Sequence, residues 1–503
     1  MRSACLLALL VCCALTASAQ HRQTGPLART FVNPLPLPDY PLGNWTQKPS
    51  PSPSMDRWLK GRVQDFRELA DPSVLFHKGR WIMYPSVAMA YVSTDFTSWT
   101  RHRITPEQIG DGYAPTVAEH GGRFYLTGCF AQLYVADDPL GPFQPLGPVR
   151  TLGGEAIDDR IFDPMLFSDE GRLYLYYHVR GKLVGTRLCE EDPTRMEIAP
   201  RELAAARTDQ EWERYGEYNE DPRRSFMEGV WMFRHGDRYY LTFTGPGTAN
   251  GTYALGAYTG ASPLGPFTYQ EANPVLRKTT GVVPGTGHGC IVRGPRNTLW
   301  AFVTSVVGNY HVFERRIGLY PVGIDSAGRL FSYPARDLPQ HAPGVLAHPE
   351  LGNETRWLPV SVRTIARASS CEPGRTADYA IDDYCRSWWQ PLAEDAAPTL
   401  TIDLKATYDV AGVRILWAEP NLDHRAGIRP GAVRYRVLYQ SRKGGPWLPA
   451  VDCSANRTDL LIDYRTFRAV PARRLRLEIV GAPPGVRIGV SEFTAFGMAP
   501  EKR

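Results

Sequence analysis

Three acidic residues stand at or just ahead of short apolar strands in widely separated parts of the chain. Asp71 begins the stretch DPSVLF, Asp163 begins DPMLF, and Glu228 interrupts the apolar run SFMEGVWMF. An Asp before a strand is commonly a turn residue that accepts hydrogen bonds from nearby amides. A carboxylate within an apolar run has to be buried, paired or functional, because burying an unpaired charge is costly. Because an acidic residue recurs at this place in three segments, the sequence predicts that the three carboxyl groups share one pocket.

Carboxyl groups that converge in one pocket are the groups needed to hydrolyse a glycosidic bond. One carboxylic acid protonates the leaving oxygen, while a second carboxylate activates water or attacks the anomeric carbon. Desolvation and a nearby Asp would both raise the pKa of Glu228 and favour its protonated form. We therefore expect Asp71, Asp163 and Glu228 to be catalytic residues.

The elements that must bring these residues together are repeats of one hairpin. After a turn, the chain returns each time through a strand of aromatic and aliphatic residues, at 78–86, 121–129, 170–178, 236–244 and, less regularly, 296–305. The copies lie roughly 40–65 residues apart, which is the period of propeller blades. The repeat predicts a five-bladed β-propeller whose innermost strands line a central funnel. An ordinary sandwich containing similar hairpins is the alternative.

The composition of the chain changes after about residue 355. Residues 356–503 contain short alternating strands broken by turns, which predict a separate β-sandwich. Residues 61–355 would form the propeller, and the Pro-rich segment 20–60 an extended N-terminal extension. The expected fold class is therefore all-β: a five-bladed β-propeller followed by a β-sandwich.

The first nineteen residues, 1–19, are typical of a signal peptide. Met1 and Arg2 precede an apolar run, and the small residues Ala17, Ser18 and Ala19 form a cleavage site. We therefore expect a secreted or periplasmic protein, cleaved after Ala19. No other stretch is long and apolar enough to span a membrane. The net charge of +5 over 503 residues is mild, which disfavours nucleic acid as a partner.

The cysteines leave the redox state open. Outside the leader they show no CxxC pair, so a zinc site is not expected. Cys371 and Cys385 could form a disulfide in an oxidising compartment, or remain buried free thiols.

The motifs around the acidic residues resemble glycoside hydrolase family 43. The matching stretches are ADPSVLFHKGRWIMYPS, FDPMLFSDEGRLYLYYH, MEGVWMFRHGDRYYLTFTG, SPLGPF and GTGHGCIV, within residues 60–335. Members of that family are five-bladed propellers that cleave pentose-containing plant polysaccharides with inversion. The resemblance implies that Asp71 is the general base and Glu228 the general acid. Asp163 would raise the pKa of the acid and orient it.

The same resemblance suggests further site residues. His288 resembles the axial histidine that holds a water-coordinated Ca²⁺, although a core histidine satisfied by the backbone is the alternative. Arg315 resembles an arginine that reaches the substrate, and Tyr113 would also contact substrate. Either Arg315 or its neighbour Arg316 could instead be a surface cation. Thr116 stands where many members have a carboxylate, so substrate contacts in the second blade would differ. No organic cofactor is expected.

Residues 356–503 resemble a discoidin, or coagulation factor 5/8 type C, domain, through ADYAIDDYCRSWW, VRILW, ARRLRLEIV and VSEFTAFG. Many such domains on bacterial hydrolases are carbohydrate-binding modules of family 32, which would hold the enzyme on its polymer. Trp388 and Trp389 could stack on a sugar or belong to the core. The resemblance also allows a structural Ca²⁺ near Asp378 and Asp382.

The leading hypothesis is an exported, inverting exo-glycosidase that removes arabinose or xylose from plant cell-wall polysaccharides or oligosaccharides. We favour α-L-arabinofuranosidase over β-xylosidase, because of the range of the family and the appended module and not because of any residue. A retaining fructosidase lacks its usual WMNDPNG motif here, and a phosphorylase would need a basic cluster that we do not find. A catalytically inactive carbohydrate-binding or adhesion protein is the alternative of another class. The oligomeric state stays open.

Overall fold

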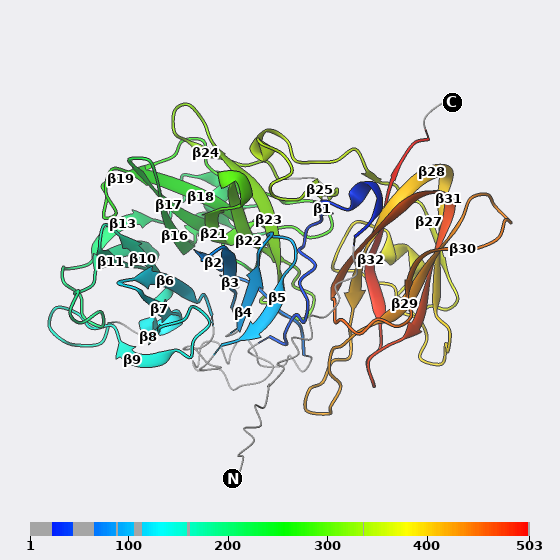
Figure 1. Cartoon of the computed structure of the whole chain (residues 1–503), viewed down its shortest axis with the longest axis horizontal. Coiled ribbons are helices and arrows are strands. Elements are labelled where there is room, and N and C mark those ends of the chain that lie inside the picture. Colours follow the sequence, from blue (N-terminus) through cyan, green and yellow to red (C-terminus); the bar gives the residue numbers. More distant parts are fainter. Residues whose placement is uncertain are drawn as a thin grey trace, which may run out of the picture.

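The computed structural model places most of the chain in two neighbouring β-rich parts (Figure 1). The described residues are 23–43, 65–86, 89–104, 113–157, 161–334 and 337–500. The predicted signal peptide and the second half of the N-terminal extension lie outside these ranges. The prediction of an all-β fold with a five-bladed propeller is confirmed.

Five antiparallel sheets form the blades, and each runs outward in chain order from its first strand. Blade one is β2 (Ser73–His77), β3 (Arg80–Tyr84), β4 (Met89–Ser93) and β5 (Thr100–Arg103); blade two is β6 (Thr116–His120), β7 (Arg123–Thr127), β8 (Gln132–Ala136) and β9 (Gln144–Pro148); blade three is β10 (Phe162–Asp169), β11 (Arg172–Val179), β12 (Lys182–Arg187) and β13 (Arg201–Ala205); blade four is β16 (Glu228–His235), β17 (Arg238–Gly245), β18 (Ala254–Gly260) and β19 (Phe267–Tyr269), with β20 (Leu276–Arg277) on β18; blade five is β21 (Gly287–Arg293), β22 (Leu299–Val306), β23 (Arg315–Ile324) and β24 (Leu330–Phe331).

The repeated hairpins of the sequence are the first two strands of the blades. The returning strands that the sequence predicts coincide with β3, β7, β11, β17 and, for the less regular copy, β22. The first strands of consecutive blades contact one another, and β2 closes the ring against β21. The residues ahead of these first strands therefore meet at one end of the propeller axis.

Polar side chains at the starts of the inner strands join neighbouring blades. Ser73 Oγ donates to the carbonyl oxygen of Pro115 at 2.7 Å, and Thr116 Oγ1 donates to that of Pro164 at 3.3 Å. Thr116, which cannot supply a carboxylate, thus couples the second blade to the third. These links keep the ends of the inner strands at a common level.

The C-terminal part is one hydrogen-bonded sheet in the order β26-β32-β28-β31-β29-β30, with β27 on β28. Its strands are β26 (Leu358–Pro359), β27 (Ile365–Ala368), β28 (Thr399–Ala418), β29 (Arg434–Gln440), β30 (Leu448–Cys453), β31 (Ile462–Gly481) and β32 (Gly489–Met498). Register shifts along β28, between Asp403 and Tyr408 and between Val410 and Gly412, allow the long strands to bend. This sheet-rich region fits the predicted β-sandwich.

The remaining elements are short. They are β1 (Thr30–Phe31), which pairs with β25 (Gln340–His341), the hairpin β14 (Arg214–Tyr215) and β15 (Asp221–Ser225), and the 3₁₀ turns η1 (Gly25–Leu27), η2 (Cys129–Ala131), η3 (Glu211–Glu213), η4 (Pro295–Asn297), η5 (Pro349–Leu351) and η6 (Ala377–Ala380). Among the described residues, no helix has the length and apolar character needed to cross a membrane.

The described part of the N-terminal extension lies between the propeller and the C-terminal part. The Asn33 side chain accepts from the Leu319 amide and donates to the Leu319 carbonyl, both at 2.9 Å, on blade five. On the other side, Arg414 Nη1 donates to the Asn33 carbonyl at 2.7 Å, and Thr30 Oγ1 lies 2.7 Å from Tyr464 Oη. The extension therefore joins the two parts.

Burial decides the role of several residues that the sequence left open. Trp389 is fully buried and Trp388 is 7% exposed, so neither offers a free face to a sugar. All the described cysteines are free, Cys385 being buried and Cys371 partly exposed. Of the two alternatives for this cysteine pair, the disulfide is therefore wrong in this structure.

We expect Asn33→Ala to destabilise the protein by about 2–4 kcal/mol, because it leaves the amide and the carbonyl of Leu319 buried without partners. The midpoint of chemical denaturation measures this loss. Asn33→Asp should also lower the midpoint, because its carboxylate would face the Leu319 carbonyl oxygen in a buried place. Equal midpoints for all three proteins would contradict this role of Asn33.

Candidate active site

Each inner strand has one residue in the left-handed backbone region, either two positions ahead of the strand or as its second residue. These residues are Asp71 (φ 49°), Ala114 (φ 46°), Asp163 (φ 50°), Gly229 (φ 65°) and His288 (φ 21°). Residues with a Cβ rarely adopt this region, and Asp is among those that tolerate it best. In blades three, four and five the strand pairing also shifts register here. Such bulges commonly redirect a side chain.

Glu228 differs slightly from the repeat that the sequence suggested. Gly229, and not Glu228, occupies the left-handed position in blade four. The carboxylate of blade four is thus offset by one residue, and blade five contributes His288 at the equivalent position. The pattern brings an acid from each of three blades and a histidine from a fourth to one end of the axis.

His288 joins two of the predicted acids. Its Nδ1 lies 3.1 Å from Asp71 Oδ1 and 3.5 Å from Asp163 Oδ2. Burial lowers the pKa of His288, but Asp163 and Asp71 outweigh burial and raise the pKa to about 9. The imidazole is therefore protonated at neutral pH. The alternative of a core histidine satisfied by the backbone is wrong, because its Nδ1 faces carboxylates.

Glu228 adjoins this cluster. The Gly229 amide donates to Asp163 Oδ2 at 3.0 Å, and the Tyr253 hydroxyl donates to Glu228 Oε1 at 2.6 Å. Burial, followed by the charge of Asp163, raises the pKa of Glu228 to about 7, although His288 and Tyr253 oppose the rise. Burial likewise raises the pKa of Asp163. The three predicted acids are thus brought together, and part of the Glu228 surface stays accessible.

Asp71 has the opposite electrostatic environment. Burial opposes its ionisation, yet Arg315, His288 and Ser86 together hold its pKa below the ordinary value. Arg315 Nη1 donates to Asp71 Oδ1 at 3.0 Å, and Ser86 Oγ donates to Oδ2 at 2.6 Å. Asp71 is therefore ionised over the physiological range, while Glu228 is about half protonated near neutral pH.

Glu68 is a site residue that the sequence reasoning missed. It is fully buried, and Oε1 accepts from Arg315 Nε at 3.0 Å and also from Nη2. Its other oxygen accepts from the Tyr113 hydroxyl at 3.1 Å. Burial raises its pKa to about 7 against the opposing effect of Arg315. The sequence did offer a signal that could have identified Glu68. Its carboxylate stands next to the apolar residues Leu69 and Ala70, just as Glu228 stands within an apolar run.

Arg315 and Tyr113, the predicted substrate-binding residues, both lie in this cluster. Arg315 is 3% exposed and its neighbour Arg316 is 7% exposed, so the alternative of a surface cation is wrong for both. The Tyr113 ring lies 5.2 Å from the Phe313 ring and 5.6 Å from the Arg315 guanidinium. In this structure both predicted residues hold Glu68 in place.

The surroundings of His288 do not form a cage for a directly ligated Ca²⁺. Calcium takes six to eight oxygen ligands. His288 can offer only nitrogen atoms, and its Nδ1 already faces the carboxylates of Asp71 and Asp163. Across the part of the chain that the structure describes, no three His, Cys, Asp or Glu residues are grouped as metal ligands, near Asp378 and Asp382 included. A Ca²⁺ held mainly through water stays a prediction.

Comparison with known proteins identifies the family. The model of Glycosyl hydrolases family 43 matches residues 66–329, and the chain belongs to this family of glycoside hydrolases. It is 25% identical over 259 residues to Beta-D-galactofuranosidase xynD of Aspergillus niger, across 44% of this chain and 69% of that protein.

Two other relatives and a solved structure are similar to this chain. Beta-xylosidase of Xylanibacter ruminicola is 29% identical over 197 residues, which cover 32% of this chain and 57% of that protein. Xylosidase/arabinosidase of Bacteroides ovatus is 26% identical over 228 residues, which cover 40% and 65%. The chain thus spans less than two thirds of these two relatives. A solved Glycoside hydrolase aligns with a TM-score of 0.47 at 19% identity, over 85% of this chain and 97% of that one.

We expect two substitutions to move the pKa of Glu228 in opposite directions. Asp163→Asn removes a neighbouring negative charge and should lower it from about 7, whereas Tyr253→Phe removes a donor to the carboxylate and should raise it. Carboxyl NMR titration of glutamate-labelled protein measures both shifts, with the signal assigned by its loss in Glu228→Gln. Shifts of the same sign would contradict the arrangement.

Proposed function

We propose that this protein is an inverting glycoside hydrolase that removes arabinose or xylose residues from plant cell-wall polysaccharides or oligosaccharides. The observation that carries the proposal is the contrast between Asp71, which is ionised, and Glu228, whose pKa of about 7 favours a protonated acid. Carboxyl groups pushed apart in pKa within one site are the mark of an acid and base pair.

The proposed mechanism assigns one task to each acid. Asp71 removes a proton from a water molecule as that water attacks the anomeric carbon. Glu228 gives its proton to the departing glycosidic oxygen, and Asp163 keeps Glu228 protonated and in place. An inverting pair needs its carboxyls roughly 6.5–9.5 Å apart so that water fits between them. The strong stabilisation of Asp71 keeps it ionised but also makes it a weaker base.

The substrate proposal draws on the relatives. Their names include a galactofuranosidase, a xylosidase and two-function xylosidase/arabinosidases. The first name denotes an enzyme that acts on a sugar in the five-membered furanose ring. Because arabinofuranose has the same ring form, α-L-arabinofuranosidase is our first choice. The name of the second relative supports β-xylosidase as the second candidate.

A catalytically inactive binding protein is the alternative of another class. A site of that kind has no physical need for several buried carboxyls, whose desolvation is costly. We further propose that the protein is exported and that its C-terminal part is a discoidin-like carbohydrate-binding domain. A water-coordinated Ca²⁺ near His288 belongs to the same proposal, and metal analysis of the purified protein tests it.

We expect the protein to release nitrophenol from para-nitrophenyl α-L-arabinofuranoside or β-D-xyloside. Asp71→Asn should lower kcat by about 100-fold or more, because it removes the base. Glu228→Gln should cause a loss of that size on oligosaccharides, whose leaving oxygen needs a proton, and a smaller loss on the nitrophenyl glycosides. Asp137→Asn, a change to an exposed side chain, is the matched control and should keep wild-type rates. Near-wild-type rates in Asp71→Asn would refute its assignment as the base.

The stereochemistry of the first product tests the mechanism separately. A single displacement by water predicts that the sugar is released with the opposite anomeric configuration, so an α-arabinofuranoside yields the β anomer first. Proton NMR during the first minutes of hydrolysis distinguishes the two anomers before they equilibrate. Net retention would exclude Asp71 as a base and require a nucleophile.

A further inference from the structure

The short segment that carries Glu68 and Asp71 is buried without belonging to a blade. Residues 65–71 lie ahead of β2 and are buried throughout. The backbone is held by separate partners: Glu68 donates to the Pro41 carbonyl at 3.1 Å, and Leu69 donates to the Arg315 carbonyl at 3.3 Å. The positions of Glu68 and Asp71 therefore depend on what holds this segment.

Arg67, next to Glu68, points to the C-terminal part of the molecule. Its Nη2 lies 2.7 Å from Asp459 Oδ2, and its Nη1 lies 3.2 Å from Glu419 Oε1. Its Nε donates to the Tyr40 carbonyl at 2.9 Å. Arg67 is 2% exposed, so removal of one acidic partner would leave a poorly compensated buried charge.

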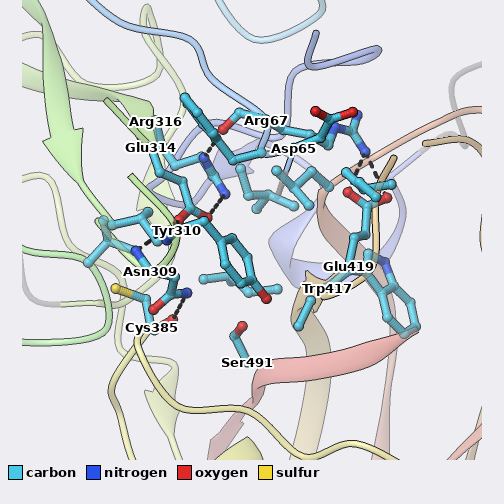
Figure 2. A pocket seen from close by; sticks show the side chains of 18 residues that line it. Asp65, Arg67, Asn309, Tyr310, Glu314, Arg316, Cys385, Trp417, Glu419 and Ser491 are labelled. Carbon is cyan, nitrogen blue, oxygen red and sulfur yellow. Dashed lines mark hydrogen bonds and ion pairs between the residues drawn. The ribbon is translucent and has the colours of Figure 1, made fainter. Parts of the chain in front are cut away.

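Asp65 makes two further contacts with the C-terminal part, and Arg316 of blade five also holds the segment. The His424 amide donates to Asp65 Oδ2 at 2.6 Å, and the His424 ring lies 2.8 Å from the same oxygen. Arg316 Nη1 donates to the Arg67 carbonyl at 2.8 Å. Figure 2 shows Asp65, Arg67, Arg316 and Glu419 around the pocket between the two parts.

The loop that leads into Arg315 is held by the same domain. Arg386 Nε donates to the Val307 carbonyl at 2.8 Å, and Asn309 Nδ2 donates to the Cys385 carbonyl at 3.0 Å. Glu314 closes this loop by accepting from the Asn309 amide at 2.8 Å, and Arg315 follows directly. Both partners of the Glu68–Arg315 pair are thus supported from the C-terminal part.

We propose that the C-terminal domain is a positioning element of the active site, with Arg67 as its main contact. Asp459 and Glu419 hold Arg67, which fixes the adjacent Glu68; Glu68 orients Arg315, and Arg315 holds Asp71. This role goes beyond attachment to a polymer. For its kinetic readout it rests on the proposed glycosidase function.

The magnitude of the effect follows from positioning. A misplacement of about 1 Å at a reacting group can cost on the order of 100-fold in rate. Asp459→Asn and Glu419→Gln keep the shape of each partner but remove its charge, so each should loosen Arg67 only partly. We expect each to lower kcat about 5- to 20-fold with KM within about 2-fold.

The kinetic experiment uses the full chain and a small aryl glycoside, whose hydrolysis does not depend on polymer attachment. Asp403→Asn is the matched control, because Asp403 pairs with Arg473 and Arg474, which both belong to the C-terminal sheet. It should leave kcat unchanged. If Arg67 acts through Glu68, the effects of Glu68→Gln and Asp459→Asn on kcat are not independent. The double variant should then have a kcat no lower than that of the more impaired single variant. Losses that multiply, or a wild-type kcat in both interface variants, would overturn the proposal.

A second readout needs no substrate. Hydrogen exchange in peptides that cover 65–71 and 313–317 should quicken in Asp459→Asn and Glu419→Gln, but not in Asp403→Asn. Unchanged exchange in both interface variants would overturn the proposal even if the aryl glycosides proved to be the wrong substrates. An inactive wild type with quickened exchange in the variants would count against the proposed function and support this positioning role.

Discussion

The balance of buried charge at the propeller axis is the constraint on which the rest of the site depends. The carboxyls of Glu68, Asp71 and Asp163 lie within ion-pair distance of Arg315 or His288. Glu228 adjoins this group and is influenced by the charges of Asp163 and His288. These buried acids outnumber the cations. Because burial disfavours an uncompensated negative charge, not all of the carboxyls ionise readily. Arg315 and His288 stabilise the ionised form of Asp71, whereas the pKa values of Glu68, Asp163 and Glu228 rise. The shortage of cations thus leaves Asp71 ionised and raises the pKa of Glu228 to about 7.

The blades make this balance possible because each has one residue in the left-handed backbone region at the start of its inner strand. Asp71, Asp163 and His288 sit at equivalent left-handed positions, whereas Ala114 contributes no charge. A second-blade carboxylate, which Thr116 does not provide, would have added another negative charge to a site already short of cations. Its absence fits the electrostatics, and Thr116 instead hydrogen-bonds the next blade.

The two parts of the molecule share one hydrophobic core and are not independent domains connected only by a linker. Leu35 and Tyr40 of the N-terminal segment pack in the same apolar cluster as Trp300 of blade five and Trp389 of the C-terminal part. A shared core restrains relative motion more firmly than a flexible linker would. A domain attached in this way can transmit position to the catalytic residues through side chains such as Arg67.

The sequence by itself indicated the all-β class, the number of blades and the three candidate acids, because hairpins, Asp-Pro starts and a carboxylate inside an apolar run are local patterns. Only the tertiary structure decided how these acids are balanced. Glu68 and Arg315 are 247 positions apart, and neither their pairing nor the placement of His288 between two carboxylates leaves a local signature. The N-terminal segment likewise reads as an extended stretch, yet its place between the two parts follows from hydrogen bonds to distant residues. Local patterns report on strands and turns, whereas pKa values and ion pairs depend on which distant side chains share a buried space.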